Sequence, residues 1–443
     1  MLTTMLDLIK ELWFLKRDIV SDDFDRALFR LAGEVPMTIH EYPTGEPCWT
    51  WRIPEKWTCH AAYLETLDGQ RLLDYSNHPL HVVSYSLPYE GVVSRAELLG
   101  HLHVHPSLPG AIPFVFKYYD RDWGLCASQT LRDSLTDEAY RVVIRTSFEP
   151  GTLKVGEVVI PGESAQSFML VAHLCHPAMV NDDLTGVVVG LDVARHLLAG
   201  PRPYYTYRLL ILPETIGSVA YLSHNEDLIP TMVAGLFLEM LGNAAPHALQ
   251  GSFQPNSQVD ICLFAALGGL DAEAYHAPYR QIVNNDERQF NAPGVRVPML
   301  SLSRVERSPQ NYRYYREYHS SLDTPAIVGG DERRFEERLV DSRRTVLGLL
   351  QAWERNQYVV NRFQGEVFCS GYGIWVDYQT NPQGHRRLFE IMERCDGERR
   401  VAGIAAELGI SFQAVWEVIA LLEEKGLVRL SRMPQPTTPQ RTP

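Results

Sequence analysis

Residues 171–186, VAHLCHPAMVNDDLTG, join the end of an apolar run to closely spaced histidine, cysteine and aspartate residues. An apolar run from Phe168 to Ala172 leads into this stretch, and such runs are typical of strands buried on both faces of a sheet. Acidic and imidazole groups crowd the end of a buried strand only where something offsets their desolvation. The stretch therefore predicts a metal site at the end of a buried strand. Five side chains that can bind a metal lie within eleven consecutive residues of this stretch: His173, Cys175, His176, Asp182 and Asp183.

Strands and helices alternate on both sides of this stretch. The segments SFMLVAHL (167–174) and YRLLILPE (207–214) have the pattern of buried strands, and residues 184–200 between them predict a helix. Further strands are predicted in 231–243 and 297–305, followed by a long closing helix over 331–356. Strand–helix–strand units build parallel or mixed sheets. We therefore expect an α/β fold in which a mixed, mostly parallel sheet is sandwiched by helices.

Other segments have different sequence patterns. Residues 2–32 predict helix, with a helix start at Ser21-Asp22-Asp23. Short β-type runs alternate with turn signals from 46 to 111, and the runs at 140–148 and 153–160 suggest a hairpin. Three helices and a short strand near the C-terminus, with Gly409 at a turn, have the winged helix-turn-helix pattern. The predicted domains are a catalytic domain (1–45 and 112–365), an inserted β-rich domain (46–111), a winged helix (375–433) and a disordered tail (434–443).

The amino-acid composition indicates which partners and which cellular compartment to expect. The 443 residues are 45% hydrophobic and 21% charged, with a formal net charge of −13, which argues against broad nucleic-acid binding. The seven cysteines form no CxxC pair, the N-terminus lacks signal-peptide features, and no apolar run approaches a membrane span. We expect a cytoplasmic homo-oligomer without a membrane partner. We also expect no nucleic-acid partner, because the predicted recognition segment 411–425 carries three glutamates against one lysine.

Polar groups follow the other predicted strands as well. Glu214 ends the second buried strand, the third carries Glu239, and the later loop REYHSSLDTP supplies Tyr318, His319 and Asp323. The carboxyl ends of parallel strands meet at one edge of a sheet, so these side chains are expected to converge. Such oxygen and nitrogen ligands suit one or two zinc ions, and manganese or cobalt are alternatives. Cys175 is expected to pack rather than to act as a nucleophile.

Four segments together resemble the signatures of zinc aminopeptidases of the co-catalytic exopeptidase fold: VAHLCHPAMVNDDLTG, PETIGS, LEMLGN and YHSSLDTP. With ELWFLKRDIV, EYPTGEPCWTWRIPEKW, NDERQF and the C-terminal pattern, the chain resembles a family of aminopeptidase-like proteins over roughly residues 8–430. Members of that family join a zinc-exopeptidase domain, a small inserted domain and a winged helix. The resemblance implies the zinc-exopeptidase, phosphorylase/hydrolase-like fold.

The resemblance also implies roles for single residues. Asp182 matches the carboxylate that bridges two metal ions, and Glu214 matches the general base. Thr215 stands where a second glutamate, a metal ligand, is expected, so the chain departs from the pattern and a two-metal site is in question. Glu239 matches an acidic ligand, and His319 matches the late histidine ligand.

The first histidine ligand and the substrate contacts are less defined by the resemblance. The aminopeptidases favour His173, whereas the winged-helix family favours His176, and the sequence leaves both open. Tyr318 matches a tyrosine that hydrogen-bonds the reaction intermediate. Asp286, Glu287 and Arg288 lie in a segment that borders the substrate in the resembling families, where Arg288 is a candidate for gripping a carboxylate.

The function expected from these residues is metal-dependent hydrolysis of an amide or peptide bond by a zinc-dependent, aminopeptidase-like enzyme. Its substrate would be a peptide or a small amide, and Glu214 would be the general base. One alternative is a one-metal amidohydrolase that deacylates a modified sugar or small metabolite. Another is a ligand-sensing regulator in which a degenerate peptidase domain is joined to a DNA-binding winged helix. The insert could cover the site or form a dimer contact.

Overall fold

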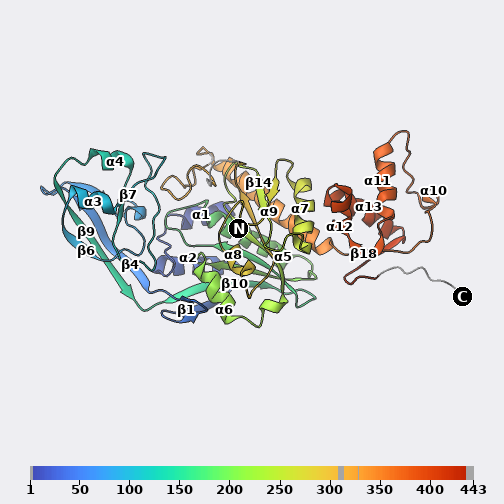
Figure 1. Ribbon diagram of the computed structural model, residues 1–443, viewed down its shortest axis with the longest axis horizontal. Coiled ribbons are helices and arrows are strands. Elements are labelled where there is room, and N and C mark those ends of the chain that lie inside the picture. The colour runs from blue at the N-terminus through green and yellow to red at the C-terminus, as the bar shows by residue number, and fades with distance from the viewer. Residues whose placement is uncertain (1–2, 308–313, 328, 436–443) are drawn as a thin grey trace. The chain divides into compact units, whose positions relative to one another are not determined.

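The computed structural model describes residues 3–307, 314–327 and 329–435 (Figure 1). The chain divides into two compact units. The first comprises Met1–Phe253 and Tyr279–Arg343, and the second comprises Gln254–Pro278 and Arg344–Pro443. Residues 254–278 thus group with the C-terminal part, although the sequence predicted one catalytic segment from 112 to 365. Among the described residues, no helix combines the length and the apolar character needed to cross a membrane.

The first unit is built on a large mixed sheet, as expected. Four of its strands, β12, β11, β13 and β16, run parallel, while β10 and β14 pair with their neighbours antiparallel. Every residue of β11 is buried, which agrees with the predicted strand buried on both faces. In the first unit the sheet order is β1 (Thr38–Pro43), β10 (Thr152–Ile160), β12 (Thr206–Leu212), β11 (Ser167–His173), β13 (Met232–Glu239), β16 (Met299–Arg304), β14 (His247–Gln250).

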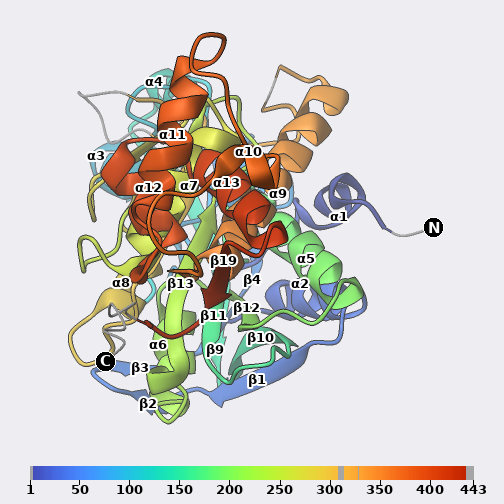
Figure 2. The same cartoon turned by 90° about the vertical axis from the view of Figure 1, so that its right-hand side faces the viewer.

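Helices flank this sheet. Figure 2 shows α5 on one side of the central strands, where it packs on β10 to β13, and α6 and α8 on the other side. The helix predicted after β11 is α5, which ends at Ala199 as the sequence indicated. The helices of the first unit are α1 (Met5–Leu12), α2 (Asp22–Ala32), α3 (Arg95–His101), α4 (Gln129–Ser134), α5 (Leu184–Ala199), α6 (Ile216–His224), α8 (Glu287–Asn291), with short 3-10 turns at Pro79–His81 and Ile229–Thr231. The long closing helix is α9 (Glu332–Arg355).

The prediction of helix throughout residues 2–32 was too broad. Helix α1 ends at Leu12, and α2 begins at Asp22 with Ser21 as the predicted N-cap. Between them, the fully buried Arg17 donates hydrogen bonds to the carbonyl oxygens of Leu12 and Trp13. The chain therefore folds back around a buried guanidinium where the apolar periodicity suggested continued helix.

The β-rich segment forms its own sheet in the first unit. Its strand order is β5 (Arg71–Asp74), β4 (Lys56–Glu65), β9 (Ala139–Glu149), β6 (Tyr89–Ser94). Strand β9 lies beyond the predicted domain boundary at residue 111. Two short pairs accompany this sheet, β2 (Pro47–Cys48) with β3 (Trp51–Arg52), and β7 (Leu102–His103) with β8 (Leu125–Cys126).

The predicted hairpin of 140–148 with 153–160 is wrong. Strand β9 pairs with β4 and β6, whereas β10 pairs with β1 and β12. The short connection at Pro150-Gly151 carries the chain from one sheet to the other. A Cβ atom at Gly151 would come within 2.6 Å of the Cβ atom of Lys56, so this crossing needs glycine. The sequence of each of these two segments indicates a strand. The strand with which each one pairs, however, depends on residues far along the chain.

The second unit contains the predicted C-terminal helices and final strand. Helix α7 packs with α12 and α13, and a small sheet has the order β18-β17-β19. Gly409 ends α12 in the left-handed conformation, with φ of 64°, at the predicted turn. Residues 436–443 of the predicted tail lie outside the described residues. The elements are α7 (Gln258–Leu270), β15 (Tyr275–Ala277), β17 (Tyr358–Asn361), α10 (Cys369–Tyr372), α11 (Pro382–Met392), β18 (Asp396–Arg400), α12 (Val401–Leu408), α13 (Phe412–Glu424) and β19 (Val428–Ser431).

Candidate metal centre

The candidate site lies at the carboxyl ends of the four parallel strands. Three of these strands are followed within three residues by a non-glycine residue with a positive φ angle: +92° at His176, +60° at Thr215 and +56° at Met240. His319, in the later loop, has a φ angle of +52°. Such angles are uncommon for residues with a Cβ atom, and strained backbone is found at functional sites.

Asp182 is the centre of the site. Its Oδ2 atom lies 3.0 Å from Nε2 of His319 and 3.8 Å from Nε2 of His176. Its Oδ1 atom lies 3.2 Å from Nε2 of His173. One carboxylate is therefore shared, with one oxygen facing His173 and the other facing His176 and His319.

Two groups of possible metal ligands share this carboxylate. We call them the His319 group (His176, Asp182, His319) and the Glu239 group (His173, Asp182, Glu239). Within each group, the three ligand atoms lie within 4.8 Å of one another. The sequence left His173 and His176 as alternatives, and the structure places one in each group.

The buried polar atoms of both groups fit a bound cation. Throughout the described part of the chain, no hydrogen-bond partner is found for Nε2 of His173, Nε2 of His176, either carboxylate oxygen of Asp182, or Oε2 of Glu239. Burying polar atoms without partners is costly, so such atoms require an explanation. Imidazole nitrogens and carboxylate oxygens are the donor set that zinc binds in catalytic sites. The residues present therefore fit zinc.

The protonation states of His176 and Asp182 suit ligands, whereas a metal would have to displace a proton from His173. Burial lowers the pKa of His176 to about 3, so its ring is neutral and keeps a nitrogen lone pair for a metal. Burial opposes protonation of His173, but the carboxylates of Asp182 and Glu239 raise the pKa of its ring well above the usual value. Burial opposes ionisation of Asp182, but the neighbouring His173 and His319 hold its pKa well below the usual value. Asp182 is therefore a carboxylate.

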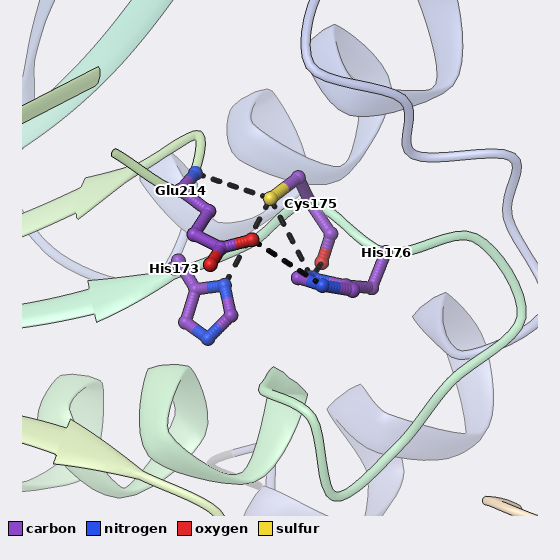
Figure 3. Close-up of side chains that lie close together, drawn as sticks. All are labelled: His173, Cys175, His176 and Glu214. Atoms are coloured by element: carbon purple, nitrogen blue, oxygen red, sulfur yellow. Dashed lines mark hydrogen bonds and ion pairs between the residues drawn. The ribbon is translucent and has the colours of Figure 1, made fainter. Parts of the chain in front are cut away.

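Glu214 reaches the site from the loop after β12. Its Oε2 atom lies 3.5 Å from Nε2 of His176, and its backbone N–H donates to Sγ of Cys175 at 3.1 Å (Figure 3). Burial raises the pKa of this carboxyl to about 7. The side chains of Glu214 and His319 are 22% and 26% exposed, whereas that of Asp182 is 1% exposed. Solvent therefore reaches the site from the side of Glu214 and His319.

Asp323 holds the loop that carries Asp182. Its two carboxylate oxygens accept the backbone N–H groups of Asn181 at 2.8 Å and Asp182 at 3.0 Å. The hydroxyl of Tyr315 donates to the same carboxylate at 2.7 Å. The sequence indicated only that Asp323 is a polar residue close to His319. Its contacts show that it fixes the backbone of the loop that carries Asp182.

Arg17 supports the same loop from the opposite end. Its Nε atom donates to the carbonyl oxygen of Leu174 and its Nη2 atom donates to that of Met179, both at 2.9 Å. The side chain is fully buried. This role could not be predicted, because Arg17 lies within the segment predicted as helix and nothing in the sequence pattern pointed to the distant carbonyl groups.

Replacing Asp323 with asparagine is expected to loosen the site. The amide has one acceptor oxygen, so one of the two buried N–H groups loses its partner, at a cost of about 1–3 kcal/mol in the free energy of unfolding. Metal affinity is expected to fall about 10- to 100-fold, as for other residues that orient ligands. Denaturant unfolding and metal titration measure both effects. The exposed Asp227→Asn is the matched control, and equal behaviour of the two variants would contradict this role.

The segment predicted to bind substrate faces the protein interior. Asp286 is fully buried and accepts the N–H of Thr215 at 2.9 Å and the hydroxyl of Ser218 at 2.6 Å. Glu287 is also buried and accepts the N–H of Asn285 at 2.9 Å. Arg288 is half-buried and donates to the carbonyl oxygen of Asn285 at 2.9 Å.

These contacts give the segment a structural role next to the site. Asp286 fixes the backbone at Thr215, one residue after Glu214. Asn285 donates from Nδ2 to Oε1 of Glu239 at 2.5 Å and so orients a candidate ligand. Asn285, which sequence analysis missed, therefore supports the Glu239 group.

Aromatic rings cover the imidazoles of the His319 group. Tyr318 stacks on His319, with ring centroids 3.9 Å apart and planes tilted by 16°. Phe114 presents its ring to His176 at 4.9 Å and to His319 at 5.3 Å, and its N–H donates to the carbonyl oxygen of His319 at 2.8 Å. Phe114 lies just after the predicted insert. The chain that leaves the insert thus covers the site.

Comparisons with known proteins agree with this architecture. The model of the family described as "Domain of unknown function (DUF4910)" matches residues 6–356. A Clostridium acetobutylicum protein named "Putative polysaccharide biosynthesis protein with aminopeptidase-like domain" is 30% identical over 413 residues, 92% of each chain.

Solved structures show the same fold. A crystal structure titled as that of a "putative peptidase" from Clostridium acetobutylicum has a TM-score of 0.83 and 28% identity, covering 96% of both chains. A zinc aminopeptidase from Bacillus subtilis has a TM-score of 0.58 at 13% identity, over 78% of this chain and 93% of its own. A peptidase M28 precursor from Shewanella amazonensis has a TM-score of 0.55 at 13% identity, over 79% and 92%. The expected α/β fold of the aminopeptidase-like type is thereby confirmed.

Proposed function

This chain belongs to the family described as "Domain of unknown function (DUF4910)", and we propose that it is a metal-dependent hydrolase of amide bonds, most simply an aminopeptidase. One observation carries the proposal: the single carboxylate of Asp182 faces two groups of ligand atoms, most of them buried without hydrogen-bond partners. The aminopeptidase-like domain named in the 30% identical relative supports the same class of reaction.

Zinc is the proposed metal, and the His319 group and the Glu239 group contain its proposed ligands. His176, Asp182 and His319 would hold one ion, and His173, Asp182 and Glu239 would hold a second. His176 would then supply the ligand that Thr215 lacks, because its Nε2 atom lies among the atoms of the His319 group. When bound, such ions polarise the scissile carbonyl and lower the pKa of an attacking water molecule.

Glu214 and Tyr318 would complete the reaction. Glu214 belongs to neither group that shares Asp182, and its part-exposed carboxylate is free to take a proton from the attacking water. It would then pass this proton to the leaving amine. Tyr318, held against His319 by stacking, would donate a hydrogen bond to the developing oxyanion.

A second substrate class is favoured by Thr215. In the resembling aminopeptidases a metal-binding glutamate occupies this position, and its replacement by threonine removes one negative charge from the site. A less negative site attracts a free amino terminus less strongly, and an N-acyl sugar has no such ammonium group. The relative's name refers to polysaccharide biosynthesis, which is consistent with deacylation of a modified sugar.

The test combines metal removal with a substrate panel. Purified protein is stripped with a chelator, reloaded with zinc, manganese or cobalt, and assayed on aminoacyl amides and on N-acetylated amino sugars. We expect hydrolysis of aminoacyl amides that disappears on stripping and returns with metal. Cleavage of the sugars alone would support the second class.

Metal binding should also be visible without substrate. Zinc at one hundred times its Kd is expected to add about 2.7 kcal/mol to the free energy of unfolding, because it binds only the folded chain. Thermal unfolding of stripped and reloaded protein measures this effect. Equal unfolding temperatures, together with activity that survives the chelator, would refute a metal-dependent hydrolase.

A further inference from the structure

The sulfur of Cys175 lies among three functional groups of the proposed site. Cys175 is fully buried between His173 and His176 at the end of β11. Its Sγ atom accepts the backbone N–H of Glu214 at 3.1 Å and lies 3.6 Å from Nδ1 of His176 and 3.8 Å from Nδ1 of His173 (Figure 3). One side chain therefore touches the proposed base and both histidines.

The sulfur lies on the side of the imidazoles that faces away from Asp182, although the sulfur and ligand atoms of His173, His176 and Glu214 also lie within 4.8 Å of one another. The Nε2 atoms of His173 and His176 face Asp182, at 3.2 Å and 3.8 Å. The sulfur instead faces the Nδ1 atom of each ring. A histidine that binds metal through Nε2 carries its proton on Nδ1 and donates it to a neighbouring group, which fixes the ring. For His173 the sulfur is such a neighbour, and for His176 the carbonyl oxygen of Cys175 accepts as well, at 2.9 Å.

The size of sulfur explains why one atom reaches all three groups. Sulfur is larger and more polarisable than oxygen, and accepts weak hydrogen bonds at longer distances. Alanine at this position would leave the buried N–H of Glu214 without its acceptor. Serine would keep an acceptor atom for this N–H group, although its oxygen lies closer to Cβ than the sulfur does.

Building on the proposed function, we propose that Cys175 is a positioning residue, whose sulfur holds Glu214 and the ligand imidazoles in one fixed arrangement. It does not bind the metal and does not attack substrate. The sequence predicted only a packing role for Cys175, because its position does not match that of a nucleophile in the resembling families. The distances above give it a specific task in the geometry of the base and the ligands.

The test compares Cys175→Ala and Cys175→Ser with Cys126→Ala, a control at another fully buried cysteine of the same unit. Cobalt(II) replaces zinc, and its visible absorption spectrum reports both affinity and ligand geometry. Circular dichroism verifies that each variant is folded. The kinetic constants kcat and KM are measured on the best aminoacyl amide.

Cys175→Ala is expected to bind cobalt about 10- to 100-fold more weakly, with an altered spectrum, or to lose kcat by a similar factor with little change in KM. Cys175→Ser should recover part of the loss, and Cys126→Ala should match the wild type. The wild-type spectrum should show no thiolate-to-cobalt charge-transfer band. Such a band would make Cys175 a ligand and overturn the inference, as would Cys175→Ala behaving like Cys126→Ala in both measurements.

The outcomes separate this inference from the proposed function. If the wild type binds cobalt but cleaves no amide, the proposed function fails, while a weakened and altered cobalt spectrum in Cys175→Ala still supports the positioning role. If the wild type is an active hydrolase that Cys175→Ala leaves unchanged in rate and spectrum, only the positioning role is refuted.

Discussion

Replacing Glu214 with glutamine is expected to lower kcat by about 10²- to 10⁴-fold, the usual loss when a general base is removed. Glutamine has nearly the same shape, and its backbone N–H still donates to Cys175, so the loop keeps its position. The amide, however, takes no proton from water at neutral pH. Steady-state kinetics measure kcat, and elemental analysis is expected to show unchanged metal content.

The exposed Glu163→Gln is a matched control for this experiment, because it makes the same substitution away from the site. It should retain wild-type kcat and unfolding temperature. A Glu214→Gln variant with wild-type turnover would remove Glu214 from the mechanism. A variant that lost metal together with turnover would instead make Glu214 a ligand.

Replacing Asp182 with asparagine is expected to have the largest effect on metal binding. Asp182 contributes an oxygen to each ligand group, so one substitution removes a negative charge from both. Residues that merely orient ligands change affinity about 10- to 100-fold. We expect a loss of more than about 100-fold for this shared carboxylate, with loss of hydrolysis.

Metal titration of the purified variant measures this loss. Glu214→Gln and Asp182→Asn act as controls for each other, because the first should keep metal and lose turnover while the second should lose both. An Asp182→Asn variant that still binds two ions tightly would show that the carboxylate is not shared between them.

The core of the fold could be predicted because its strands are local and strongly apolar. The run that ends at His173 and the next one, which ends at Leu212, are buried strands, and the helix between them is α5. The pairing of β9 and β10 could not be predicted in this way. Both segments have sequences typical of strands, but each pairs with strands far along the chain. Nothing within residues 139–160 specifies these pairing partners.

The site residues could be predicted for a similar reason. Each follows an apolar strand, and parallel strands end at one edge, so convergence follows from topology alone. The choice between His173 and His176 could not be made, because it depends on the directions of side chains around a corner with positive φ. The supporting residues Arg17 and Asp323 were missed or underrated, since they act on backbone groups of a loop distant in sequence.

The bridge between Pro113 and Ser320 joins the segment that follows the predicted insert to the segment that carries His319. Ser321 reinforces it, since its N–H donates to the carbonyl oxygen of Ile112 at 2.8 Å and its hydroxyl accepts the N–H of Ile112 at 3.0 Å. The backbone next to His319 is therefore held in place by residues 112–113, about 200 residues earlier in the sequence. Changes in length or sequence at 112–113 should alter the position of His319, so the two segments should vary together among relatives.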